Sequence, residues 1–372
     1  IRDGGRYRHA AAGAGFDPQP AADAPACMLW LAAHLADAGV AARLRDAAAD
    51  ASAAVPAGET VGIGHVVRPA LPLLVRADEG AAEGAIVRAA ALARRLAAEI
   101  TAAGGRPRYV PGETDYAATL GADDVNGHSA IVTERMLDAA VLCGDEATIR
   151  EALAALDLVT RAYPAGQVPR GAQPWEIPLH CPDILAAARL ARSNVLGHLL
   201  DGNPRRLAEA RGWAWSGVPF VYLRDPVAEA RVGRYATIGV FGATGWEAPV
   251  WIGRPVQWCG LVYAAALREL ARADAALAGT WNTLAGGIPR TALAMPFPAD
   301  DPRAGLLPDF WEFAADRGDG PAINPATLQG SLAEAFDALP LVTATRVPGT
   351  AGHGGHVVHV AGRTGRVTVS DG

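Results

Sequence analysis

Paired helical segments, each pair split by a short break, are the feature that most constrains the fold of this chain. Residues 126–143 and 146–162 form one pair around "CGDE", and residues 182–200 and 204–215 form another around "DGNP". Breaks of this kind combine a glycine that ends one helix with an Asp or Asn that caps the next. The pattern therefore predicts antiparallel helical hairpins.

The same periodicity recurs along the chain and predicts about six hairpins in all. The other pairs are residues 26–53 with a hinge at Gly39, 65–77 with 80–103, 255–273 with 275–285, and 306–316 with 325–338. Six hairpins suggest a closed ring, an (α/α)6 toroid, whose inner helices are apolar all round and whose outer helices carry charge on one face. The segments "ILAAARLARSNVLGHLL" and "WCGLVYAAAL" suit the inner role.

The tail has a different pattern, because from Leu339 onward Val and Thr alternate between glycines, as in strands and turns. The fold class expected is therefore mainly α, a toroid with a small C-terminal β segment. We expect an N-terminal extension over residues 1–23, the toroid as catalytic domain over 24–338, and the β-rich segment over 339–372.

Charge and composition exclude several function classes. The net charge of −6 argues against nucleic acid as a partner, because phosphate binding needs a basic face. All 33 basic residues are arginine, which is typical of a GC-rich bacterial genome and excludes a Schiff-base or P-loop lysine. No run of about 18 apolar residues predicts a membrane span, so we expect a soluble chain, either cytoplasmic or secreted. A homo-oligomer is left open.

No cofactor and no metal are expected. The four cysteines, Cys27, Cys143, Cys181 and Cys259, have no zinc-finger spacing. The tail holds three histidines in "HGGHVVH", but on a strand His356 and His359 would point to opposite faces.

The densest chemical stretch is "QPWEIPLHCPD", residues 173–183, in a long connection that precedes a predicted inner helix. Pro182 and Asp183 are interpreted as the start of that helix, with the acid complementing its dipole. Trp175, Glu176 and His180 then remain as candidates for function. Glu176 would have a raised pKa if buried among apolar neighbours, as a general acid needs, and an ion pair with Arg170 is the alternative.

A second long connection, "TGWEAPVWIGRPVQWCG", repeats the Trp–Glu pair as Trp246 and Glu247. Long connections on a rigid scaffold commonly carry function, and these precede inner helices, so we expect them to gather at one mouth of the ring. Trp251 and Trp258 follow in the same connection. The four Trp could stack on sugar rings, or the last two could fill the core.

The remaining candidates are polar groups in these and other connections. Asp115 as a second carboxylate, with Tyr116 and His128 as proton carriers, lies in a third connection, "RYVPGETDYAATLGADDVNGHS". Tyr222 is a further proton carrier, His65 and Arg68 open the segment at 65–77, and Arg68, Arg170, Arg234 and Arg254 could form a fork for a carboxylate.

The hairpin plan together with "PRGAQPWEIPLH", "VFGATGWEAPVWIGRPVQWCG" and "INPATLQ" resembles the (α/α)6-toroid carbohydrate-active enzymes, the six-hairpin glycosidases and the related polysaccharide lyases. The resemblance covers residues 24–338 at the level of plan and singles out no one family. It implies a carbohydrate substrate, including one that bears a uronic acid. It also implies either inverting hydrolysis by two carboxyl groups or β-elimination beside a uronate.

A glycoside hydrolase with Glu176 as acid and Glu247 or Asp115 as base is the function we predict. Inversion needs about 6.5–9.5 Å between the two carboxyl groups. A lyase using Tyr116, Tyr222, His128 or His180 is the alternative. A zinc toroid of the lanthipeptide-cyclase kind, built on His180, Cys181 and Cys259, and a non-catalytic sugar-binding toroid are further alternatives.

Overall fold

The computed structural model describes residues 2–3, 6–7, 28, 32, 35–54, 79–118, 123–173, 178–241, 251–323, 341–347, 355–361 and 367–369. The chain divides into two compact units. One comprises residues 1–88, 296–309 and 319–372, and the other comprises residues 89–295 and 310–318. The second unit holds the helical hairpins and the candidate site.

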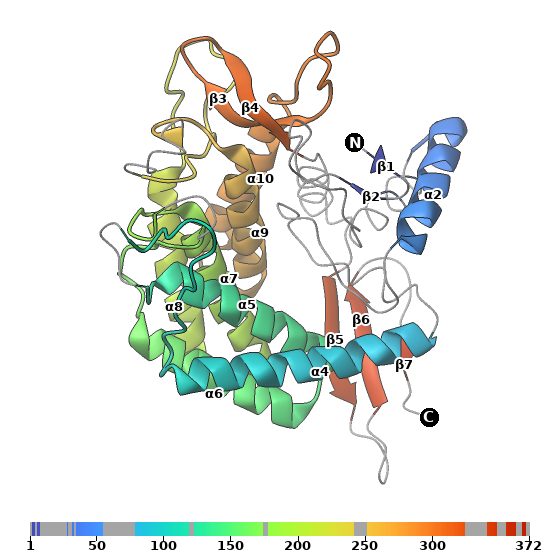
Figure 1. Cartoon of the computed structure of the whole chain (residues 1–372), viewed down its shortest axis with the longest axis vertical. Coiled ribbons are helices and arrows are strands. Elements are labelled where there is room, and N and C mark those ends of the chain that lie inside the picture. Colours follow the sequence, from blue (N-terminus) through green and yellow to red (C-terminus); the bar gives the residue numbers. More distant parts are fainter. Residues whose placement is uncertain are drawn as a thin grey trace. The chain divides into compact units, whose positions relative to one another are not determined.

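Three consecutive helical hairpins form the second unit. They are α5 (Asn126–Cys143) with α6 (Glu146–Ala162), α7 (Ile184–Asp201) with α8 (Pro204–Gly217), and α9 (Gln257–Ala273) with α10 (Ala278–Ala292). In each hairpin the second helix packs on the first, and α5, α7 and α9 pack against one another in that order (Figure 1). We call α5, α7 and α9 the inner helices.

The hairpin breaks have the predicted chemistry. Gly144 and Gly202 follow α5 and α7 in the left-handed conformation, with φ of 62° and 70°. Asp145 and Asn203 then cap α6 and α8 by accepting backbone N–H groups from the first turn of each helix. The prediction of helices at 126–143, 146–162, 182–200 and 204–215 is confirmed to within about two residues.

Burial separates inner from outer helices, as the sequence predicted. Helix α7 is buried around most of its circumference, while α6 buries one face, formed by Thr148, Ala152, Ala155, Leu156 and Val159. The two layers approach closely at Gly197 of α7, where an added Cβ would lie 2.5 Å from Leu156 Cδ2. Apolar stripes that face one another in this way provide most of the stability of such a layer.

The other described elements lie outside these three hairpins. They are β1 (Arg2–Asp3), β2 (Arg6–Tyr7), α2 (Ala38–Ala53), α4 (Glu79–Ala102), the 3₁₀ turn η1 (Val218–Phe220), β3 (Leu307–Glu312), β4 (Arg317–Ile323), β5 (Leu341–Val347), β6 (Gly355–Ala361) and β7 (Val367–Val369). β1 pairs with β2, and β3 pairs with β4. In the tail β6 pairs antiparallel with both β5 and β7, which confirms the strands expected there.

Two parts of the helical prediction are wrong. Residues 306–316 contain β3 and no helix, because five consecutive buried residues from Leu307 to Trp311 fit a strand buried on both faces. The expected hinge at Gly39 is displaced: residues 35–37 are non-helical, and Asp37 accepts the backbone N–H of Val40 at 2.9 Å. The predicted helices at 65–77 and 325–338 lie outside the described residues. Within the described ranges, no helix is both long and apolar enough to cross a membrane.

Candidate functional site

The first turns of the inner helices are joined by the chain segments that precede them. Residues 168–173 lie against the start of α5, where Gly127 N–H donates to the Arg170 carbonyl at 2.8 Å. The Asn126 side chain donates to the Val168 carbonyl at 2.8 Å and accepts the Arg170 N–H at 2.9 Å. This buried amide therefore fixes the approach to α7 against α5.

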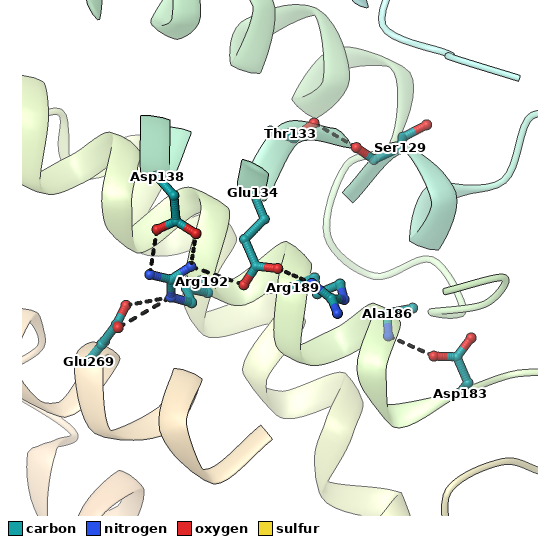
Figure 2. A network of polar contacts seen from close by, with 9 residues as sticks. All are labelled: Ser129, Thr133, Glu134, Asp138, Asp183, Ala186, Arg189, Arg192 and Glu269. Carbon is teal, nitrogen blue, oxygen red and sulfur yellow. Dashed lines mark hydrogen bonds and ion pairs between the residues drawn. The ribbon is translucent and has the colours of Figure 1, made fainter. Parts of the chain in front are cut away.

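Asp183 occupies the junction between this segment and α7. Its backbone N–H donates to the Pro169 carbonyl at 3.0 Å. Its carboxylate accepts the Ala172 N–H at 2.8 Å and the Ala186 N–H at 2.7 Å, the latter contact being drawn in Figure 2. The interpretation of Asp183 as the cap of this helix is confirmed, and the residue is also buried, with 1% of its surface exposed.

Burial raises the pKa of Asp183 to about 6. The N–H groups of Ala172 and Ala186 and the charge of Arg189 act in the opposite direction, since each favours the carboxylate. A carboxyl group with this pKa can both hold and release a proton close to neutral pH, which is what general acid catalysis needs.

A second segment, residues 237–241, joins α7 to α9. Ile184 N–H donates to the Gly239 carbonyl at 3.1 Å, and Phe241 N–H donates to the Pro182 carbonyl at 2.9 Å. At the start of α9 the buried Gln257 amide accepts the Thr237 N–H at 2.9 Å. The three inner helices thus present their N-terminal turns on one rigid platform, which we call the mouth.

Two thiols lie near Asp183. Cys181 Sγ is 3.8 Å from His180 Nε2, and Cys259 Sγ is 4.0 Å from Gln173 Oε1. Burial raises the pKa of the Cys181 thiol to about 11, so it stays protonated at neutral pH. In the part of the chain that the structure describes, no group of three or more His, Cys, Asp or Glu is arranged to hold a metal ion.

Several sequence-predicted residues lie beside this loop. The Tyr116 carbonyl accepts the Leu179 N–H at 3.1 Å, so residues 115–116 lie beside the loop residues that precede His180. Tyr116 packs on the apolar cluster of Tyr109, Val125 and Leu179. Asp115 is exposed and accepts the Ala117 N–H at 3.0 Å.

The two described Trp candidates lie in the core. Trp251 and Trp258 are 1% and 3% exposed and meet edge to face, with ring centroids 6.1 Å apart. This burial favours the core interpretation over the sugar-stacking one for both residues.

The other described candidates have internal partners. Arg254 pairs with Glu312 at 2.6 Å, and the Tyr222 hydroxyl donates to the Gly253 carbonyl at 3.1 Å. Burial raises the pKa of Tyr222 and lowers that of His128. Arg234 is exposed and stacks on Tyr235, with its guanidinium 4.7 Å from the ring centroid.

Six of the candidates lie outside the described residues and remain predictions. They are Trp175, Glu176, Trp246, Glu247, Arg68 and His65.

A network of ion pairs among the inner helices was not predicted from the sequence. Arg192 of α7 bonds to Asp138 through both terminal nitrogens, at 2.7 and 2.8 Å, and its Nε lies 3.1 Å from Glu269 of α9. Glu134 of α5 bridges Arg192, at 3.1 Å, and Arg189 (Figure 2). The available signal was spacing: the acids are four residues apart on α5 and the arginines three apart on α7, so each pair shares a helix face.

By its likeness to solved structures the chain has the fold of an α/α toroid, and the three described hairpins fit that fold. The chain is similar to solved structures of unsaturated glucuronyl hydrolase. One, a variant with dGlcA-Glc-Rha-Glc, has a TM-score of 0.54 at 15% identity, covering 90% of this chain and 91% of that one. The enzyme from Bacillus sp. GL1, described as responsible for the degradation of glycosaminoglycan, has a TM-score of 0.50 at 15% identity with the same coverage.

A third similar structure is an unsaturated glucuronyl hydrolase specific for heparin, with a TM-score of 0.54 at 10% identity and coverage of 91% of both chains. At these identities the likeness establishes the fold. No protein-family model matches the chain, and neither does any curated protein.

Proposed function

We propose that this chain is a glycoside hydrolase acting on oligosaccharides that carry an unsaturated glucuronyl residue, with Asp183 as its acid. The observation that carries the proposal is the likeness in fold, over about nine tenths of the chain, to solved structures of this kind of enzyme. The buried Asp183 carboxyl, with its raised pKa at the mouth, is the proposed acid. The solved structures with this fold and near-complete coverage are named for that activity.

The chemistry of the mouth suits this reaction. Cleaving a glycosidic bond requires a proton for the substrate and an activated water. With a pKa of about 6, roughly a tenth of Asp183 is protonated at pH 7, and the remainder is available as a base. One residue can therefore donate a proton and later recover it.

The second carboxyl is proposed among Asp115, Glu176 and Glu247. Of these three residues, Asp115 is the one that the structure describes. Its neighbour Tyr116 accepts the N–H of Leu179, which lies in the loop that leads into Asp183. Arg170, whose backbone is fixed against α5, is the proposed partner for the uronate carboxylate.

The test follows the ultraviolet absorbance of the conjugated C=C–carboxylate of an unsaturated glucuronyl disaccharide. Hydrolysis releases the unsaturated sugar as a hemiacetal, and when its ring opens the enol becomes a ketone, so the conjugated band is lost. By contrast, β-elimination in a uronate polysaccharide creates the band. We expect the absorbance to fall with wild type and to stay constant with Asp183→Asn. A rise on intact uronate polysaccharide, or binding of the disaccharide without turnover, would overturn the proposal in favour of a lyase or a sugar-binding protein.

A further inference from the structure

Two of the described glutamines are buried at the mouth, and their side-chain amides differ in how they are bonded. Gln257, at the start of α9, uses both its N–H donors and both acceptor positions of its oxygen. Its Nε2 donates to the Tyr235 carbonyl at 3.1 Å and the Ile288 carbonyl at 2.9 Å. Its Oε1 accepts the Thr237 N–H at 2.9 Å and the Thr237 hydroxyl at 3.2 Å. The folding of the mouth therefore accounts for this amide completely.

The Gln173 amide has almost none of these bonds, although the residue is only 1% exposed. Its Oε1 lies 4.0 Å from Cys259 Sγ, which is a weak contact, and its Nε2 is buried with no hydrogen-bond partner among the described residues. An unpaired buried NH2 group opposes folding, because it gives up its bonds to water and receives none in return. Such a group calls for a partner from outside the chain, such as a bound ligand.

The contacts of Gln173 lead to the proposed acid from two sides. The residue before it, Ala172, donates its N–H to the Asp183 carboxylate at 2.8 Å. On the other side, Cys259 lies next to Gly239, where an added Cβ would be 3.4 Å from the Cys259 sulfur. The Gly239 carbonyl in turn accepts the N–H of the first residue of α7 at 3.1 Å. These contacts hold the amide close to the first turn of α7, which Asp183 caps.

We propose that the Gln173 amide is a substrate-binding group, which hydrogen-bonds a hydroxyl of the sugar presented to Asp183. A sugar hydroxyl both donates and accepts, so it pairs with this amide whichever way the nitrogen and oxygen are turned. Asp183 is covered to the same extent as Gln173, so the substrate uncovers both groups when it enters the mouth. The inference rests on the proposed function and adds to it a residue that selects a hydroxylated ligand beside the acid.

The test replaces Gln173 by Met, which has a similar length and no amide. Binding of the unsaturated glucuronyl disaccharide is measured by isothermal titration calorimetry in the Asp183→Asn background, which prevents turnover. Gln173→Met should raise the Kd about five- to tenfold, because one hydrogen bond to the sugar is lost. It should also raise the Tm by about 1–3 °C, because an unpaired buried group is removed. An amide with a purely structural role predicts the reverse, a lower Tm and an unchanged Kd.

Two further variants are matched controls. Thr160 of α6 also has a buried side-chain oxygen with no partner among the described residues, so Thr160→Val should leave the Kd unchanged without lowering the Tm. Gln257→Met should instead lower the Tm by about 5 °C or more, because it leaves the partners of a fully bonded amide unpaired.

An unchanged Kd for Gln173→Met would overturn the inference, and so would failure of the Asp183→Asn protein to bind the disaccharide. The proposed function has a separate readout, which is cleavage of the disaccharide by the chain with Asp183 intact. Binding that depends on Gln173 without such cleavage would overturn the proposed function alone. Cleavage with an unchanged KM for Gln173→Met would overturn the inference alone. If Gln173→Met fails to fold, Gln173→Leu takes its place.

Discussion

Asp183 and Asp274 are two buried aspartates whose pKa values are shifted in opposite directions. Asp183 precedes α7 and is held by the backbone N–H groups of Ala172 and Ala186. Asp274 follows α9 and accepts two hydrogen bonds from Arg211, at 2.6 and 2.7 Å. It also accepts one from Trp281 Nε1 at 2.9 Å. Burial raises the pKa of Asp183 to about 6, whereas the hydrogen bonds from Arg211 lower the pKa of Asp274.

This difference shows that burial alone does not determine the pKa of an aspartate. A guanidinium bonded to both oxygens compensates for lost hydration, while two neutral N–H groups compensate only in part. A buried carboxyl that has only neutral N–H partners costs stability, and such groups concentrate at functional sites. We therefore interpret Asp274 as structural and Asp183 as functional.

The largest expected effect is the difference in activity and stability between variants of Asp183 and of Asp274. Asp183→Asn should lower kcat/KM by about a hundredfold or more, because it removes the proton donor. Asp274→Asn should leave kcat/KM of the folded enzyme close to wild type and lower the free energy of unfolding by about 3 kcal/mol, because it weakens the bonds to Arg211 and Trp281. Kinetics and urea unfolding of both variants check this. Equal losses of activity would remove the distinction.

The second prediction concerns stability against pH. The pKa of Asp183 in the folded chain lies above its ordinary value of 3.8, so the folded state binds this proton more tightly. Its contribution to the free energy of unfolding should therefore fall by up to about 3 kcal/mol as the pH rises from about 4 to about 6. Asp274 has the opposite sign: its contribution is present above the unfolded pKa and is lost as the pH falls through the lowered folded pKa.

Urea unfolding as a function of pH, taken as wild type minus Asp183→Asn and wild type minus Asp274→Asn, measures these two slopes. Slopes of the same sign would contradict the contrast between the two sites.

A smaller effect should distinguish the mouth from the outer layer. At Gly127 an added Cβ would lie 2.5 Å from both the Ala172 nitrogen and the Arg170 oxygen, so Gly127→Ala should displace the segment that holds Asp183. We expect a loss of about 1–3 kcal/mol in stability and lower activity. Gly279→Ala, in the first turn of α10 with open space around it, is the control and should be neutral or stabilising by about 0.5 kcal/mol. Thermal unfolding and activity assays would show whether the two positions differ.

The smallest effect is expected for a pair of exposed charges on an outer helix. Arg150 and Glu146 lie 3.3 Å apart on α6 with most of their side-chain surface exposed. Arg150→Ala should therefore change the free energy of unfolding by less than about 0.5 kcal/mol, with activity unchanged. A larger loss in urea unfolding would mean that charge pairs contribute alike on both layers of the toroid.

The hairpins could be predicted because their ends are local. Gly144 and Asp145 stop one helix and start the next through contacts within a few residues, so the sequence of α5 and α6 contains the information. The expected helix at 306–316 was wrong, because a short apolar run has no periodicity that separates helix from strand. Its turn, with Asp316 at a φ of 46°, forms in the folded hairpin of β3 and β4.

The candidate site was only partly predictable. The sequence located the loop at 173–183 and the helix cap at Asp183, but the burial of that carboxyl comes from residues 168–173 and 237–241, which are distant along the chain. The ion network depends in the same way on three helices meeting. Chemistry that depends on long-range packing leaves little trace in local spacing.

The pH dependence of kcat/KM for an unsaturated glucuronyl disaccharide, measured for wild type and Asp183→Asn, tests the central claim most directly. We predict a wild-type profile that turns at an apparent pKa of about 6, and a variant that loses both this turn and about a hundredfold or more of the activity. An Asp183→Asn enzyme with wild-type kcat/KM and an unchanged profile would contradict the claim.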